Sequence, residues 1–280
     1  MKICRILRTV KCLRFIQILY QLYYRLHKVS FREARLESVY MLQMEKAIYK
    51  SPCLNNGVFS FLNIESRFPD WNDTSHGMLW VYNLNYMDWL YQQDMTFDEG
   101  AKWIDCFIAE QLQNRVGLDP YPIALRGINW IKFIVRFRDS IDEEKFKEWS
   151  DFLYSQYVLL TKRIEYHLLG NHLLEDACSL FIASIFFHDE KIYRKASRLL
   201  FRELQEQLLS DGAHFEQSPM YHCILLDRLL DCYNISQCNL IFMGQDRAVA
   251  CLREKAELML GHLENICNKD GSLPLFNDSA

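Results

Sequence analysis

Glycine and proline are scarce in this sequence, with 10 and 6 residues among 280. Half of the residues are hydrophobic and 14% are aromatic, which is ample for a packed core. This composition excludes a fibrous or a disordered chain. We therefore expect a folded, helix-rich protein, long enough for one large domain or two small ones.

Paired cysteines, long apolar runs and nucleotide motifs are also missing. The 10 cysteines are spread singly, without a Cys-x-x-Cys pair, which indicates buried thiols in a reducing compartment and not a disulfide framework. No stretch approaches the roughly 20 apolar residues of a membrane span. The chain has no Gly-x-Gly-x-x-Gly, P-loop or Gly-x-Ser-x-Gly motif, so nucleotide chemistry and serine hydrolysis have no support.

Acidic residues are nearly absent from the first 35 positions, which hold nine Lys and Arg residues against one acid, Glu33. This leaves 23 of the 32 basic and 35 of the 36 acidic residues for the rest of the chain, whose charge excludes a nucleic-acid binder. The basic residues interrupt the N-terminal apolar stretch, and no small-residue cleavage site follows, as a secretory signal would need. We expect a cytoplasmic protein.

Apolar residues recur at helical spacing over residues 3–28, with basic residues mostly between them. Residues 1–50 are therefore expected to form a basic amphipathic helical arm. Two interpretations stay open for it. The arm docks on the body of the protein, or residues 1–35 lie on an anionic membrane surface, which would place the protein peripherally at the inner membrane.

Turn signals dominate residues 51–96, which predicts an irregular segment with two short strands near 58–62 and 79–84. Helical periodicity then continues to residue 267, and short polar connections between the helices favour antiparallel neighbours. The expected helices cover approximately residues 97–114, 126–138, 143–168, 172–187, 189–209, 219–236 and 245–267.

Two polar clusters lie at junctions between these helices. In the first, Gly170 is expected to end one helix and Asn171 to cap the next, which leaves His172 in its first turn. In the second, Ser218 caps a helix whose first residue is Pro219, and Tyr221 follows in the first turn. The helix dipole there favours a phenolate, although a packing tyrosine explains the pattern as well.

The second cluster also contains His214, Glu216 and His222, whose spacing matches no zinc motif. We therefore expect no metal site and no cofactor. A third segment, 119–130, has a rigid Pro-Tyr-Pro lead-in before Arg126, Asn129 and Trp130. Arginine can hold a carboxylate and tryptophan offers a face for a sugar ring, but the residues alone favour an exposed arginine and a core tryptophan.

Together these segments resemble the heparinase II/III-like polysaccharide lyase family. The most specific matches are Gly-Asn-His at 170–172 and Ser-Pro-Met-Tyr-His at 218–222. The resemblance implies an all-α fold, an incomplete α/α toroid of antiparallel helical hairpins, over residues 51–280. In the family a β-sandwich follows this domain, so the sequence resembles a fragment of a longer protein. The matching stretches are 80–86, 120–130, 165–175, 211–222 and 274–280.

The resemblance also implies β-elimination on an acidic, uronate-containing bacterial polysaccharide similar to a glycosaminoglycan. By motif position, Asn171 would neutralise the uronate carboxylate, while His172 and Tyr221 would move protons, in roles that the sequence leaves interchangeable. The expected substrate contacts are Arg126, Asn129, Trp130, His222 and Glu216.

Two other functions stay open at this point. One is a non-catalytic glycan-binding or assembly protein in surface-polysaccharide metabolism. The other is a glycoside hydrolase on a similar toroid, which requires a pair of carboxylates across the cleft. The sequence offers Glu175, Asp176 and Glu216 as candidates for that pair.

Overall fold

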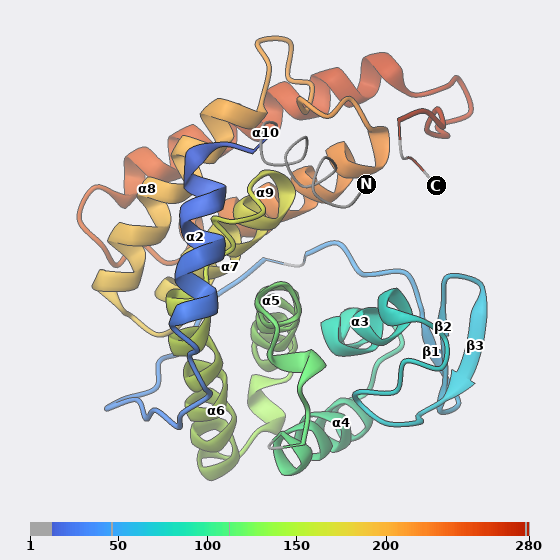
Figure 1. The fold of residues 1–280 in the computed structure, drawn as a ribbon, viewed down its shortest axis with the longest axis vertical. Helices are drawn as coiled ribbons and strands as arrows, with labels where there is room; N and C mark the ends of the chain where they lie inside the picture. Colours follow the sequence, from blue (N-terminus) through green and yellow to red (C-terminus); the bar gives the residue numbers. More distant parts are fainter. Residues whose placement is uncertain (1–12, 46, 112, 278, 280) are drawn as a thin grey trace.

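The computed structural model describes residues 13–45, 47–111, 113–277 and 279. Most of this part of the chain is helical. A small antiparallel sheet lies beside α3 and α4 at one edge of the molecule (Figure 1). The α-helices are α2 (Phe15–Leu26), α3 (Met78–Tyr86), α4 (Phe97–Glu110), α5 (Pro120–Arg136), α6 (Glu143–Lys162), α7 (Gly170–Phe186), α8 (Glu190–Gln207), α9 (Pro219–Cys238) and α10 (Gln245–Ile266).

Capping residues explain where several helices begin. The side chains of Thr96, Asp142 and Asp189 each accept a hydrogen bond from a backbone amide in the first turn of α4, α6 and α8. Such bonds satisfy amides that have no partner within the helix. The prediction that Ser218 caps a helix starting at Pro219 is confirmed, because Ser218 Oγ accepts from the amide of Tyr221 at 3.4 Å.

The sheet has the order β1 (Leu54–Asn55), β2 (Val58–Phe61) and β3 (Ile64–Arg67), in antiparallel pairing. The strand predicted near 58–62 is therefore confirmed, but the one predicted near 79–84 is wrong, because those residues belong to α3. Helix α3 is short and mainly apolar, and it buries Trp80, Val81 and Leu84. Periodicity alone does not distinguish such a run from a buried strand.

The helices from α5 onward form consecutive pairs, with α5 against α6, α7 against α8 and α9 against α10. Helix α7 lies between α5 and α9, and every residue from Leu173 to Phe186 is buried. This arrangement is the expected incomplete α/α toroid. Three short 3-10 turns complete the described elements: Asp88–Tyr91, Val116–Leu118 and Arg138–Ser140.

Only Phe15–Leu26 of the predicted N-terminal arm is helical among the described residues, and the predicted start at residues 3–12 lies outside them. After α2 the chain runs extended across α6 and α9 (Figure 1). None of the helices in the described part of the chain is long and apolar enough to cross a membrane. The cysteines at described positions are all free thiols.

Candidate functional site

A cleft of about 1260 Å³ lies where the N-terminal ends of α5, α7 and α9 meet α3 and the arm. A helix carries a partial positive charge at its N-terminal end, so three such ends favour an anionic ligand in the cleft. Of the predicted site residues, Asn171, His172, Glu216 and Tyr221 line this cleft. The fold therefore brings together two helix starts that are about fifty residues apart in the sequence.

The start of α7 differs from the sequence prediction. Helix α6 ends at Lys162, and an irregular loop of seven residues follows before α7 begins at Gly170. Leu169 is the residue before the helix, and both Leu169 and Gly170 have positive φ angles, of 62° and 56°. Gly170 therefore does not end a helix, and Asn171 is no cap. The turn instead places Asn171 and His172 in the first turn of α7, at the cleft.

His172 is held by a carboxylate that the sequence analysis did not select. Its Nδ1 lies 3.0 Å from Oε2 of Glu165, whose side chain is buried. A carboxylate accepts hydrogen bonds, so this contact assigns the proton of a neutral imidazole to Nδ1 and leaves the Nε2 lone pair available. Asp176 fixes Glu165 in turn, because its Oδ2 accepts from the Glu165 amide at 2.7 Å.

Asn171 and Glu216 link the two helix starts across the cleft. The side-chain amide of Asn171 donates to Oε2 of Glu216 at 3.1 Å. An amide presents donors without carrying charge, so Asn171 can also donate to a carboxylate of a ligand. Tyr221, in the first turn of α9, lines the same cleft and completes this group of candidate residues.

The predicted substrate contacts Arg126, Asn129 and Trp130 are not on the cleft surface, and the prediction is corrected here. All three side chains are fully buried in α5. The Arg126 guanidinium donates to the carbonyl oxygens of Asn85 and Gly117, at 3.0 and 2.7 Å. Burial lowers its pKa to about 9. These residues support the wall of the cleft from behind, because they are buried and their N–H groups bond to the protein itself.

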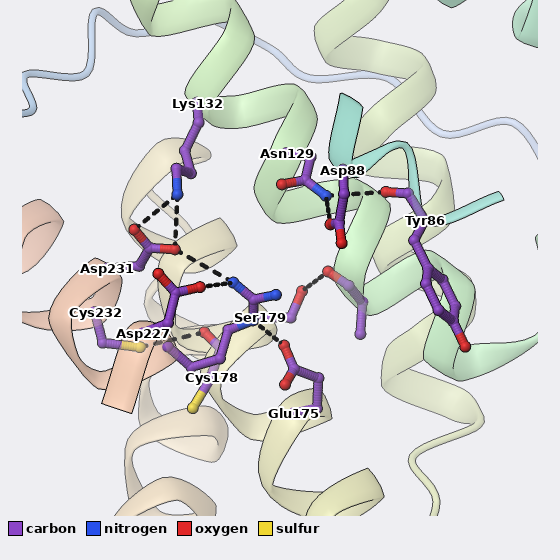
Figure 2. Close-up of polar contacts among 12 residues, drawn as sticks. Tyr86, Asp88, Asn129, Lys132, Glu175, Cys178, Ser179, Asp227, Asp231 and Cys232 are labelled. Carbon is purple, nitrogen blue, oxygen red and sulfur yellow. Dashed lines mark hydrogen bonds and ion pairs between the residues drawn. The ribbon is translucent and has the colours of Figure 1, made fainter. Parts of the chain in front are cut away.

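Asn129 shows how this support works. Its side-chain amide donates to the Tyr86 carbonyl at 3.0 Å and to Oδ1 of Asp88 at 2.6 Å (Figure 2). Both of these residues line the cleft. His222 is also buried, and its Nε2 contacts the carbonyl of Met259 at 3.0 Å, so it is not a direct substrate contact either.

Three tyrosines that the sequence analysis left out form one wall of the cleft. The rings of Tyr82 and Tyr86 are stacked at 6.3 Å, Tyr121 meets Tyr86 edge-on, and the His172 ring lies 4.5 Å from Tyr121. The spacing of Tyr82 and Tyr86, one helical turn apart, was the signal that could have identified them. Tyrosine faces of this kind suit a sugar ring, with a hydroxyl for hydrogen bonding.

The tyrosine hydroxyls of this wall remain protonated at neutral pH. Burial, followed by the nearby Asp119 carboxylate, raises the pKa of Tyr82 to about 12. Burial also raises the pKa of Tyr86 and that of Tyr121 well above the usual range. These hydroxyls therefore act as hydrogen-bond donors and not as phenolates.

The base of the cleft is an ionic network that joins α5, α7 and α9. Figure 2 shows the Lys132 ammonium directed at the Asp231 carboxylate, with Asp227 next to Asp231 and Glu175 farther from Lys132. Arg228 bridges all three carboxylates, and Lys132 contacts both oxygens of Asp231 at 3.0 Å. Lys50 pairs with Asp227 at 2.5 Å and supplies the third cation, so the charges balance within the network, which fixes the helices relative to one another.

The carboxylates proposed for a hydrolase do not form a pair across the cleft. Glu175 is buried against Arg228, and Asp176 is fully buried behind Glu165. Of that set only Glu216 lines the cleft. Among the described residues, no three His, Cys, Asp or Glu side chains are placed to hold a metal ion together.

The arm forms part of the cleft as well. Tyr24, His27 and Lys28 line it, and the Tyr24 hydroxyl donates to the carbonyl of Ile164 at 2.5 Å. Gln17 donates to the carbonyl of Leu168 at 3.2 Å. Helix α2 therefore packs on the loop that carries Glu165, which confirms the docked interpretation of the arm for its described part.

Residues 125–280 match the family profile described as heparinase II/III N-terminus. The chain belongs to this family. A comparison with curated protein sequences found no significant match.

Solved structures of heparinases share the fold. The chain is similar to a heparan sulfate lyase HepC mutant from Pedobacter heparinus, with a TM-score of 0.58, 18% identity, and coverage of 94% of this chain and 45% of HepC. It is also similar to the heparinase III BT4657 gene product, with a TM-score of 0.54, 18% identity, and coverage of 73% of this chain and 37% of that protein. The chain thus spans less than half the length of these heparinases.

Proposed function

We propose that this chain forms the helical substrate cleft of a polysaccharide lyase that cleaves a uronate-containing polysaccharide by β-elimination. The observation that carries the proposal is the meeting of Asn171, His172 and Tyr221 in one cleft, with Glu165 bonded to His172. Membership of the heparinase II/III family supports the reaction class, and HepC is by its description a heparan sulfate lyase.

The reaction begins with removal of the C5 proton beside the uronate carboxylate. The carboxylate must be neutralised, since proton loss next to an anion otherwise builds up a dianion. The Asn171 amide is suited to donate to that carboxylate, and the N-terminal end of α7 adds its partial positive charge. The Asn171 amide has two N–H groups, so one can keep its bond to Glu216 while the other donates to the substrate.

His172 and Tyr221 then divide the proton transfers. The Nε2 lone pair of His172 can take the C5 proton, because Glu165 holds the other ring nitrogen. Tyr221 can protonate the glycosidic oxygen as the bond between C4 and that oxygen breaks, without water entering the reaction. The reverse assignment, with Tyr221 as base and His172 stabilising the enolate, uses the same residues.

The test uses ultraviolet absorbance of the unsaturated uronate product. The chain is incubated with heparan sulfate, hyaluronan, alginate and polygalacturonate, and absorbance and reducing ends are followed together. We expect new absorbance with at least one of them, and a decrease of about a hundredfold or more in Tyr221→Phe, which removes only the hydroxyl. Tyr233→Phe, on the same helix but outside the cleft, is the matched control and should keep full activity.

Other results would assign another function. New reducing ends without absorbance would identify a hydrolase. Polysaccharide binding without either product would identify a glycan-binding domain. Full activity in Tyr221→Phe would remove Tyr221 from the mechanism.

A further inference from the structure

The outward face of α2 is a stripe of apolar side chains. The stripe consists of Phe15, Leu19, Leu22, Tyr23 and Leu26, and its members are between 45% and 79% exposed. At about 100° per residue, their spacing keeps all five within an arc of about 100° around the helix. Scattered single apolar residues are normal on a surface, but a continuous stripe along a whole helix indicates an interaction surface.

The opposite face of α2 fixes the direction in which the stripe points. Gln17 and Tyr24 bond to backbone carbonyls of the loop before α7, and the rings of Tyr20 and Tyr166 lie 4.5 Å apart. Arg14 adds an ion pair with Glu206 at 2.6 Å. Because this face is taken by the body, the apolar stripe is held away from it.

The charge around the stripe determines which partner it fits. Residues 1–35 contain nine Lys and Arg residues and one acid, so this part of the chain has a strong positive charge. Arg25 of α2 is exposed, and the sequence before the described part adds Lys2, Arg5, Arg8 and Lys11. Basic residues next to an exposed apolar helix face are typical of helices that lie in the interface of an anionic bilayer.

We propose that the α2 stripe binds the surface of an anionic lipid bilayer, with the apolar side chains in the acyl boundary and the basic residues at the headgroups. The two interpretations of the arm then hold together, since one face of α2 docks on the body while the other meets lipid. Helix α2 also contributes Tyr24 to the cleft, so this contact would hold the cleft beside the membrane. The proposal does not depend on the lyase reaction.

Sedimentation with vesicles tests the proposal. The full chain is mixed with vesicles of phosphatidylcholine and phosphatidylglycerol in equal parts, and with vesicles of phosphatidylcholine alone. We expect binding to the anionic vesicles that weakens as salt is added, and little binding to the neutral ones. The Leu22→Gln/Leu26→Gln variant should bind the anionic vesicles about tenfold or more weakly, because it removes apolar surface without changing charge.

A matched variant separates the stripe from general surface hydrophobicity. Leu258→Gln/Leu260→Gln removes two exposed leucines from α10 and should bind as the wild type does. Arg25→Gln should weaken anionic binding by a smaller factor, about fivefold. The proposal is overturned if the wild type stays in solution with anionic vesicles, or if the α10 variant loses as much binding as the stripe variant.

Self-association is the remaining alternative, and sedimentation velocity without vesicles decides it. If the wild type is a dimer that only the stripe variant dissociates, and vesicles do not bind, the stripe is an interface between two copies and the lipid proposal fails.

Discussion

Glu165 and His172 make the contact on which the proposed chemistry most depends. The Glu165 carboxylate is buried and 3.0 Å from Nδ1 of His172, and its own backbone is anchored by Asp176. A histidine that is half exposed at a helix start would otherwise rotate among several orientations. The carboxylate restricts it to one, with the same ring nitrogen always facing the cleft.

This contact predicts the effect of two substitutions at one position. Glu165→Ala removes the acceptor, and we expect kcat to fall about a hundredfold with KM nearly unchanged, because orientation matters in the transition state. Glu165→Gln keeps an acceptor oxygen, so its kcat should fall only about tenfold. Glu257→Gln, in a surface ion pair of α10, is the control. Equal kcat in all three variants would show that Glu165 has no positioning role.

His214 predicts how stability depends on pH. It is buried, its Nε2 lies 3.2 Å from Oε1 of Gln207, and its Nδ1 has no hydrogen-bond partner among the described residues. Burial, with a smaller effect from His222, lowers the pKa of His214 to about 4. In the unfolded chain the His214 imidazole takes up a proton near pH 6.5, whereas in the folded protein it takes up the proton only at lower pH. Stability that is present above pH 6.5 is therefore lost as the pH falls towards 4.

Urea unfolding at pH 7 and pH 5 measures this effect. We expect His214 to account for a loss of about 1–2 kcal/mol in the free energy of unfolding between these values. His214→Asn can still donate to Gln207. Between pH 7 and pH 5, its free energy of unfolding should fall by about 1–2 kcal/mol less than that of the wild type. An identical loss in the variant would contradict the assignment.

At the scale of elements, the ion pair between Lys132 and Asp231 joins α5 to α9. Both side chains are buried, and each Asp231 oxygen accepts from the ammonium. The network at the base of the cleft thus sets how α5 and α9 lie relative to each other. The helix starts that carry Tyr121 and Tyr221 depend on that geometry.

Removing one partner should reveal the cost of weakening a buried ionic network. We expect Lys132→Met to lower the free energy of unfolding by about 3 kcal/mol, since Asp231 then keeps only its longer contact with Arg228, at 3.5 Å. Lys147→Met breaks a surface pair with Asp151 and should cost about 0–1 kcal/mol. Chemical denaturation of both variants makes the comparison, and equal losses would mean that the buried pair is solvated.

The start of α7 illustrates a limit of sequence reasoning at this scale. Glycine after a helical run and asparagine before the next one predict two caps, but here α6 ends before Gly170 and α7 begins with it. Glycine can stand at the end or at the start of a helix, because it adopts positive φ angles without steric cost. The loop conformation depends on contacts with α2 and Asp176, which lie outside the local sequence.

Across the whole molecule, the positions of the helices were predicted more accurately than the side chains that face the cleft. Helices predicted at 143–168, 189–209 and 245–267 are found at Glu143–Lys162, Glu190–Gln207 and Gln245–Ile266. Amphipathic periodicity and capping residues are local properties, so they can be read from the sequence without knowledge of the fold. The toroid itself was expected from motif resemblance, which the family profile confirms.

Which side chains line the cleft was decided only by the three-dimensional arrangement of the helices. Local sequence was enough to locate the polar helix starts with Asn171, His172 and Tyr221, and to establish the basic, amphipathic character of the arm. It did not reveal that Arg126, Asn129 and Trp130 face the core while Tyr82, Tyr86 and Tyr121 face the cleft. Every residue of α5 from Pro122 to Ile134 is buried, because α3, α6 and α7 pack around this helix. Such contacts between distant segments set the burial of each side chain, and burial separates a supporting residue from one that can touch a ligand.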